Sequence, residues 1–213
     1  MIIAVMSCSK NEKTFTPFHY CMETNWPEHP KVVYFTDGII NPFYYTVPVP
    51  NTLNDWTKAV RQFLWCLDDE QVLLMIDDCF IRRPVDHERV QIASQILAAE
   101  PNLACMNFEK AWDESDEPTK YEGWKKRQHG SNYEVSLMCG LWNRDKLMKV
   151  LERDCDPWTI ELEQDNCGFD YYINAGDYII DWGYKTFQQF GIAKGVWTRE
   201  CIDYLRSIGF EVN

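Results

Sequence analysis

The sequence predicts a single α/β domain in which helices flank a mostly parallel sheet. Short apolar runs, rich in β-branched and aromatic residues, alternate with stretches of helical periodicity along the first half of the chain. The runs are apolar throughout rather than alternating with polar residues, which is typical of strands buried on both faces of a parallel sheet. With 213 residues, the chain has the length of one compact domain with a sizeable core.

The elements follow one another in the order that such a fold requires. Four runs are expected to be strands, at residues 1–7, 31–38, 71–76 and 103–108. Apolar residues recur at spacings of three and four over 54–68 and 86–99, which predicts two amphipathic helices. Ligands of parallel α/β sheets bind at the carboxyl ends of the strands, so polar residues at those ends are the first candidates for a site.

The second half of the chain is less regular. Residues 109–134 have neither helical nor strand periodicity, and a loop of this length is expected to be functional or disordered. It is followed by the apolar run VSLMCGLW at 135–142, a helix from about Asn143 and a closing helix at 198–209.

Composition limits the classes of protein. The net charge of -12 argues against non-specific binding of nucleic acid, although WKKRQHG at 124–130 forms a local basic cluster. Nine cysteines without a CxxC pair indicate reduced thiols, and the four histidines lack the spacing of a zinc site. Without a long apolar run or a signal-like N-terminus, we expect a cytoplasmic protein with no membrane contact.

Two adjacent acids, Asp77 and Asp78, directly follow the apolar run QVLLMI. Burying a carboxylate without a partner is costly, so a metal ion, a protein cation or ligand hydroxyls are expected beside them. Mg²⁺ or Mn²⁺ held there would bridge a diphosphate and neutralise its charge as a leaving group. The alternative is that one acid caps the following turn and the other pairs with Arg82 or Arg83.

Five sequence blocks, taken in order, resemble a small family of nucleotide-sugar glycosyltransferases with the GT-A (Rossmann-like) fold, of bacterial or bacteriophage type. The blocks are YFTDG, DWTKAVRQFLWCLDDEQVLLMIDDCFIRRPVD, VSLMCGLWNRDKLMKVL, DPWTIE and GIAKGVWTRECIDYL. The resemblance implies a nucleotide-binding half at about 1–108 and an acceptor-side half at about 109–213 within one domain. The usual acidic motif of such enzymes is D-x-D, whereas this chain has Asp77, Asp78 and Cys79.

The resemblance also assigns expected roles to residues. Nucleotide donor contacts, for example to a uridine diphosphate, are expected from Ser7, Ser9, Asp37 and Asp77, with Arg61 placed near the diphosphate by its helix position. Asp78 is the expected metal ligand, and Mn²⁺ or Mg²⁺ the expected cofactor. Glu161 matches the carboxylate that acts as base, and attack from the face opposite the diphosphate would invert the anomeric centre.

On the acceptor side, Trp142 and Trp158 flank the candidate catalytic base, and one or the other is expected to stack on a nucleobase or a sugar face. The acceptor is either a saccharide or, as in some compact phage enzymes, a hydroxymethylated pyrimidine in DNA. For DNA, Lys125, Lys126 and Arg127 would contact phosphate. A metal-dependent nucleotidyltransferase and an inactive nucleotide-sugar-binding module are the alternative functions, and no protein partner is implied.

Overall fold

The computed structural model describes residues 1–49, 55–111, 115–163, 166–183, 191–193 and 195–212. Within these residues one large sheet of nine strands runs through the molecule in the order β3-β2-β1-β4-β8-β5-β9-β7-β6. The strands are β1 (Ile2–Met6), β2 (Val32–Thr36), β3 (Tyr45–Pro48), β4 (Gln71–Ile76), β5 (Leu103–Lys110), β6 (Glu117–Pro118), β7 (Trp124–Lys126), β8 (Gly140–Asn143) and β9 (Asp170–Asn174).

Most strands of this sheet run in the same direction. Among the described residues, β8 is antiparallel to its neighbours β4 and β5, and β7 is antiparallel to β9 and β6. The remaining pairs, from β3 to β4 and between β5 and β9, are parallel. The prediction of a mostly parallel α/β sheet in a single domain is therefore confirmed, and β8 from the second half of the chain lies between two strands from the first.

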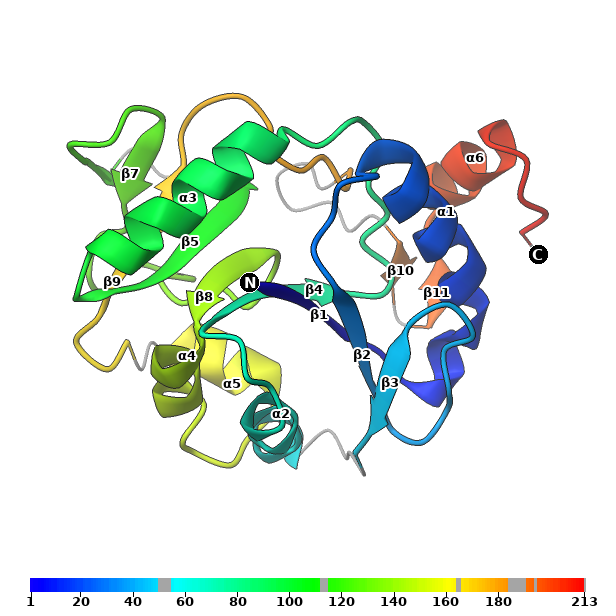
Figure 1. Cartoon of the computed structure of the whole chain (residues 1–213), viewed down its shortest axis with the longest axis horizontal. Coiled ribbons are helices and arrows are strands. Elements are labelled where there is room, and N and C mark those ends of the chain that lie inside the picture. Colours follow the sequence, from blue (N-terminus) through cyan, green and yellow to red (C-terminus); the bar gives the residue numbers. More distant parts are fainter. Residues whose placement is uncertain (50–54, 112–114, 164–165, 184–190, 194, 213) are drawn as a thin grey trace.

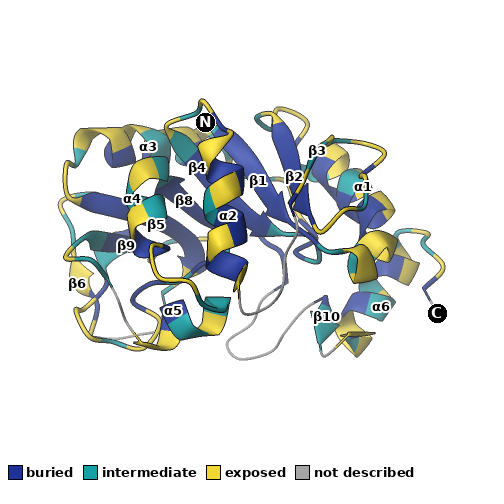
Figure 2. Cartoon of the chain, turned by 90° about the horizontal axis from the view of Figure 1, so that it is seen from below, coloured by how far each residue is buried: buried dark blue, intermediate teal, exposed yellow. Residues whose placement is uncertain are grey.

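Helices cover both faces of the sheet (Figure 1). One face packs against α1 (Phe15–Asn25), α3 (His87–Ala99) and α6 (Arg199–Ser207). The other packs against α2 (Trp56–Trp65), α4 (Arg144–Val150) and α5 (Pro157–Glu163). Alternate β1 residues enter the two cores, Ile3 and Val5 on the first face and Ile2 and Ala4 on the second. Figure 2 shows the result: buried strands between helices whose outer faces are exposed.

The helix starts follow from local side chains. Asp86, Asn143 and Thr198 each accept a hydrogen bond from a main-chain N–H three residues later, which caps α3, α4 and α6. The expected helices at 86–99 and from about Asn143 are thus confirmed to within a residue at their starts. No described helix is long and apolar enough to cross a membrane.

Several elements differ from the expectation. The helix α1 and the preceding short helix η1 (Ser9–Thr14) follow β1, where the sequence pattern indicated no helix. The region 109–134 is more regular than a loop, because the last residues of β5 and the hairpin of β6 and β7 fall within it. A two-stranded unit, β10 (Ile192–Ala193) and β11 (Val196–Trp197), lies apart from the main sheet.

Candidate active site

The carboxyl edge of the sheet gathers acidic side chains from two strands and a helix. β4 ends at Ile76, immediately before Asp77 and Asp78, and β5 carries Glu109 at its end. Leu74 of β4 and Asn107 of β5 both pair with Gly140, the first residue of the intervening strand β8. Asp77 and Asp78 follow Leu74, and Glu109 follows Asn107, so these acids lie at the same edge of the sheet. Two strand spacings, or about 10 Å, separate β4 from β5 across the sheet.

Asp77 is buried at this edge and accepts hydrogen bonds from neighbouring side chains, so it does not face a ligand. Its side chain is 0% exposed. Ser7 and Thr14 donate hydroxyl hydrogen bonds to Oδ2 at 2.5 and 3.1 Å, and the Asn11 amide donates to Oδ1 at 3.0 Å. Burial first, and then the charge of Asp78, raises the pKa of Asp77 to about 7. The expected contact of Ser7 and Asp77 with the donor is corrected to a supporting role: they fix β1, η1 and β4 together.

Asp78 is only partly buried. Its Oδ2 accepts a 2.7 Å hydrogen bond from the main-chain N–H of Ile192. Gly191 packs so closely that an added Cβ would lie 2.7 Å from the same oxygen. Burial raises the pKa of Asp78. The segment that contains β10 thus lies against the candidate metal ligand.

The structure brings together the two expected nucleotide loops after β1 and β2. The Ser9 N–H donates to Asp37 Oδ1 at 2.6 Å, and its hydroxyl donates to Oδ2 at 3.1 Å. Both residues are exposed at the carboxyl ends of adjacent parallel strands. This pair is the part of the expected donor site that remains accessible to a ligand.

Glu161 lies on α5 and is 9% exposed. Its Oε1 accepts a 2.8 Å hydrogen bond from the main-chain N–H of Leu137, in the segment that leads into β8. Burial raises the pKa of this carboxyl group to about 7. A carboxylate with such a pKa is well suited to take a proton near neutral pH.

Glu109 is a candidate site residue that the sequence analysis missed. It is 6% exposed, and its Oε2 accepts a 3.4 Å hydrogen bond from Ser136, the residue before Leu137. Its pKa is raised to about 7 by burial and by the charge of Glu161, against the lowering effect of Arg127. An acid at the end of the run LACMNF was the available signal, since the same rule located Asp37 and Asp77.

The fit of a divalent cation can be judged from the acids that are present. No group of three or more His, Cys, Asp and Glu side chains forms a ready metal cage within the described ranges. Asp78 nevertheless offers one carboxylate beside the buried charge of Asp77. Mg²⁺ and Mn²⁺ commonly use one or two protein carboxylates and take their other ligands from phosphate and water. The donor set therefore fits a cation that arrives with a diphosphate.

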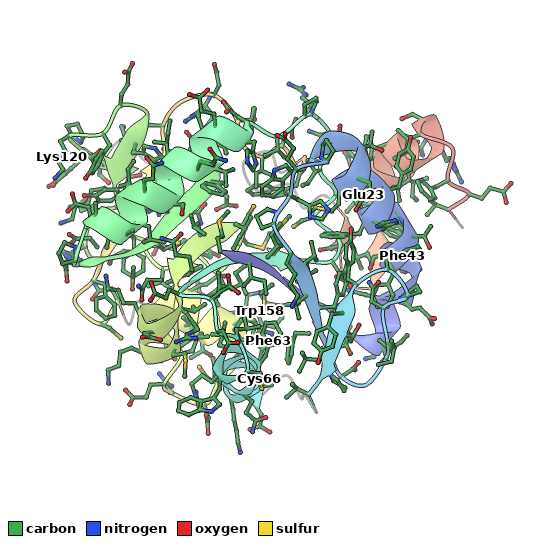
Figure 3. All side chains as sticks on the ribbon, in the orientation of Figure 1. Glu23, Phe43, Phe63, Cys66, Lys120 and Trp158 are labelled. Carbon is green, nitrogen blue, oxygen red and sulfur yellow. The ribbon has the colours of Figure 1, made fainter. Side chains whose placement is uncertain are left out.

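The two expected stacking residues have opposite environments. Trp142 of β8 is 0% exposed, and Gly140 packs against its ring so closely that an added Cβ would lie 2.8 Å from Nε1. Its expected role on the acceptor side is corrected: it belongs to the core. Trp158 of α5 is 55% exposed, three residues before Glu161. Figure 3 labels it on the side of the sheet that carries α2 and α5.

This difference predicts the effect of removing each ring. Trp142→Ala should lower the free energy of unfolding by about 3–5 kcal/mol, because it leaves a large cavity in the core. Trp158→Ala should change it by less than about 0.5 kcal/mol, as expected for an exposed position. Urea denaturation of both variants measures the two values. Equal losses would contradict the placement of Trp142 in the core.

The basic residues are mostly engaged within the protein. Arg61 donates to the Leu151 carbonyl and pairs with Asp154 at 2.5 Å, so it holds α2 to the segment after α4 instead of facing a diphosphate. Arg127 is 3% exposed and donates to the carbonyls of residues 132 and 133. Lys126 forms a 2.7 Å ion pair with Asp170. The expected phosphate contact by Arg127 is therefore corrected to a structural role, and Lys125 remains half-buried on β7.

No protein-family model matches the sequence, and no curated protein matches it at a significant level. The structure is similar to CMP:2-keto-3-deoxy-manno-octonic acid synthetase complexed with CTP, with a TM-score of 0.57 and 13% identity over 97% of both chains. It is also similar to a cytidylyltransferase from Leptospira borgpetersenii, with a TM-score of 0.50 and 8% identity over 83% of this chain and 76% of that one.

A third similar structure is TarS from S. aureus, with a TM-score of 0.49 and 9% identity. The match covers 83% of this chain but only 35% of TarS. At such low identities, the similarities to the synthetase and the cytidylyltransferase show the fold alone. They confirm a Rossmann-like α/β fold in which helices flank a mostly parallel sheet.

Proposed function

We propose that this protein is a glycosyltransferase that moves a sugar from a nucleotide-diphosphate sugar to an acceptor hydroxyl, with inversion. The observation that carries the proposal is Glu161, a buried carboxylate with a pKa raised to about 7 at a sheet edge that also holds Asp77 and Asp78. Sugar transfer needs a base for the acceptor hydroxyl and a neutralising group for the leaving diphosphate. Glu161 would supply the base, and a divalent cation held by Asp78 would supply the neutralising charge.

In this mechanism the exposed pair of Ser9 and Asp37 binds the nucleoside, with the diphosphate directed toward Asp78. A divalent cation bound by Asp78 would supply charge neutralisation of the diphosphate. Glu161 takes the proton of the acceptor hydroxyl while the oxygen of that hydroxyl forms a bond to the anomeric carbon. The bond between this carbon and the diphosphate oxygen breaks on the opposite face. The Leu137 N–H fixes the orientation of Glu161 throughout.

A saccharide is the acceptor that the charges favour. The net charge of -12 repels a DNA backbone, and the basic cluster expected to offset it has Arg127 buried and Lys126 paired with Asp170. The exposed ring of Trp158, on the same helix as Glu161, offers an apolar face of the kind on which sugars stack.

Ligand binding provides the first test of this proposal. A nucleoside diphosphate such as UDP, added with Mn²⁺ or Mg²⁺, should raise the melting temperature, since a ligand that binds only the folded state stabilises it. At a hundred times its dissociation constant the ligand adds about 2.7 kcal/mol. A thermal-shift screen of uridine, guanosine, cytidine and thymidine diphosphates, with and without metal, measures the effect. No shift with any of them would contradict the donor site.

Nucleotidyl transfer is the second candidate, because the match to the synthetase complexed with CTP covers 97% of both chains. A nucleotidyltransferase would release pyrophosphate from a nucleoside triphosphate. The segment after β1 argues against a nucleotidyltransferase. Its sequence, SCSKNEK at 7–13, has no glycine to bring the main chain close to phosphates. A triphosphate that stabilises the protein far more than the matching diphosphate would favour this candidate.

A further inference from the structure

Two consecutive residues of the segment that leads into β8 donate hydrogen bonds to two different buried carboxyl groups. Ser136 donates its hydroxyl to Glu109, and the next residue, Leu137, donates its N–H to Glu161. Both acids are nearly inaccessible, at 6% and 9% exposed. Two carboxylates that accept hydrogen bonds from consecutive residues in a poorly solvated site do not both ionise readily, because each charge opposes the other.

The surroundings of the pair are mixed in charge. Arg127, the residue after β7, acts on Glu109 as the opposing positive charge, and the thiols of Cys105 and Cys139 lie close enough to be affected by Glu109. On the other side, Glu109 lines a cavity of about 20 Å³ together with Asp181 and Trp182. Asp181 is itself neutralised by ion pairs with Arg82 and Arg83 at 2.9 and 3.0 Å.

The cavity next to Glu109 has the size and the polar groups for one water molecule. A volume above about 10–15 Å³ accommodates a water, provided that two or more polar partners surround it. Glu109 and Asp181 are the two acidic residues that line the cavity. Trp182, a third wall residue, has an indole N–H that is buried without a hydrogen-bond partner among the described residues. A buried donor of this kind normally finds a partner.

We propose that Glu109 is a positioning residue that titrates together with Glu161 as one pair, so that the two groups hold a single proton at neutral pH. When Glu161 takes the proton of the acceptor hydroxyl, the pair holds two protons. Glu109 then releases one to a water in the cavity bounded by Asp181 and Trp182, and the pair returns to its starting charge. The catalytic part of this inference rests on the proposed function, whereas the shared titration does not.

A direct titration of the two side chains tests the pairing without any assay of activity. Carboxyl ¹³C resonances of labelled glutamate should show two titration steps for the pair, separated by about one pH unit or more. Glu109→Gln and Glu161→Gln should each leave a single titration step, at the lower of the two pH values. The remaining carboxyl group then ionises without a second negative charge beside it. Glu117→Gln on the exposed strand β6 is the matched control and should leave both steps. An unchanged titration of Glu161 in Glu109→Gln would overturn the pairing.

Stability provides a second measurement. Burial raises the pKa of both groups from 4.5 to about 7, so the folded state binds more protons than the unfolded state across this range. Their stabilising contribution is present below pH 4.5 and is lost as the pH rises through about 7. Glu109→Gln should flatten the fall in free energy of unfolding over this interval, and a fall identical to that of the wild type would contradict the proposal. If the two glutamates titrate as a pair but no sugar is transferred, the proposed function is contradicted and the paired titration still holds.

Discussion

Glu161→Gln should reduce sugar transfer by about a hundredfold to ten-thousandfold, the usual size of a general-base contribution. The amide keeps the shape of the side chain but cannot accept the proton of the acceptor hydroxyl. Because the amide oxygen can still accept the hydrogen bond of the Leu137 N–H, the site keeps its shape and binding of the donor should remain within about twofold. Steady-state kinetics and calorimetric titration of the nucleoside diphosphate measure the two quantities separately.

The dependence on pH adds a sharper criterion for the same variant. Glu161 acts as a base only when ionised, so the wild-type rate should rise with pH through the pKa of about 7 and level off above it. This rise should vanish in Glu161→Gln. Glu163→Gln, an exposed acid on the same helix, should behave as the wild type. Near wild-type transfer by Glu161→Gln at every pH would place the base elsewhere.

Asp78→Asn should weaken nucleoside diphosphate binding by at least tenfold to a hundredfold in the presence of Mn²⁺, and far less without metal. Mutation of a residue that only hydrogen-bonds to a metal ligand typically lowers metal affinity by about tenfold to a hundredfold, and loss of the ligand itself should lower it at least as much. The amide lacks the charge that a divalent cation requires, although it can still accept the hydrogen bond of the Ile192 N–H. Calorimetric titration with and without metal measures the difference.

Asp68→Asn is the matched control for this experiment, because Asp68 is an exposed acid that lies before β4 and therefore at the opposite edge of the sheet. It should bind the diphosphate as the wild type does. Equal losses for Asp78→Asn under both conditions would instead indicate a metal-free site in which protein cations neutralise the diphosphate.

The sequence was most informative where a strong local pattern coincides with burial. Uninterrupted apolar runs located β1, β2, β4 and β5, and the spacing of apolar residues located α2 and α3. The rule that ligands bind at strand ends then led to Asp37 and Asp78, both at the carboxyl edge. By contrast, β9 and the two-residue and three-residue strands β6 and β7 are specified by pairing with distant strands, which a local pattern does not contain.

Side-chain environment was harder to predict than position. Trp142 and Trp158 each stand between an apolar and a polar residue, yet one lies on a central strand and the other is exposed on a helix. The basic residues after Trp124 looked like an exposed patch, but the turn at 127–134 folds Arg127 inward onto main-chain carbonyls. Glu109 was overlooked because the residues that follow it are polar, and only tertiary structure places it beside Glu161.

The central claim, that this acidic sheet edge transfers a sugar, is tested most directly by ³¹P NMR of the reaction products. The protein is incubated with Mn²⁺ and a panel of nucleotide-diphosphate sugars, with and without simple saccharide acceptors, and in parallel with nucleoside triphosphates and sugar phosphates. We expect one donor to release its nucleoside diphosphate, slowly with water and faster with an acceptor, and Glu161→Gln to abolish the acceleration. Pyrophosphate formed from a nucleoside triphosphate and a sugar phosphate, with no nucleoside diphosphate from any donor, would contradict the account.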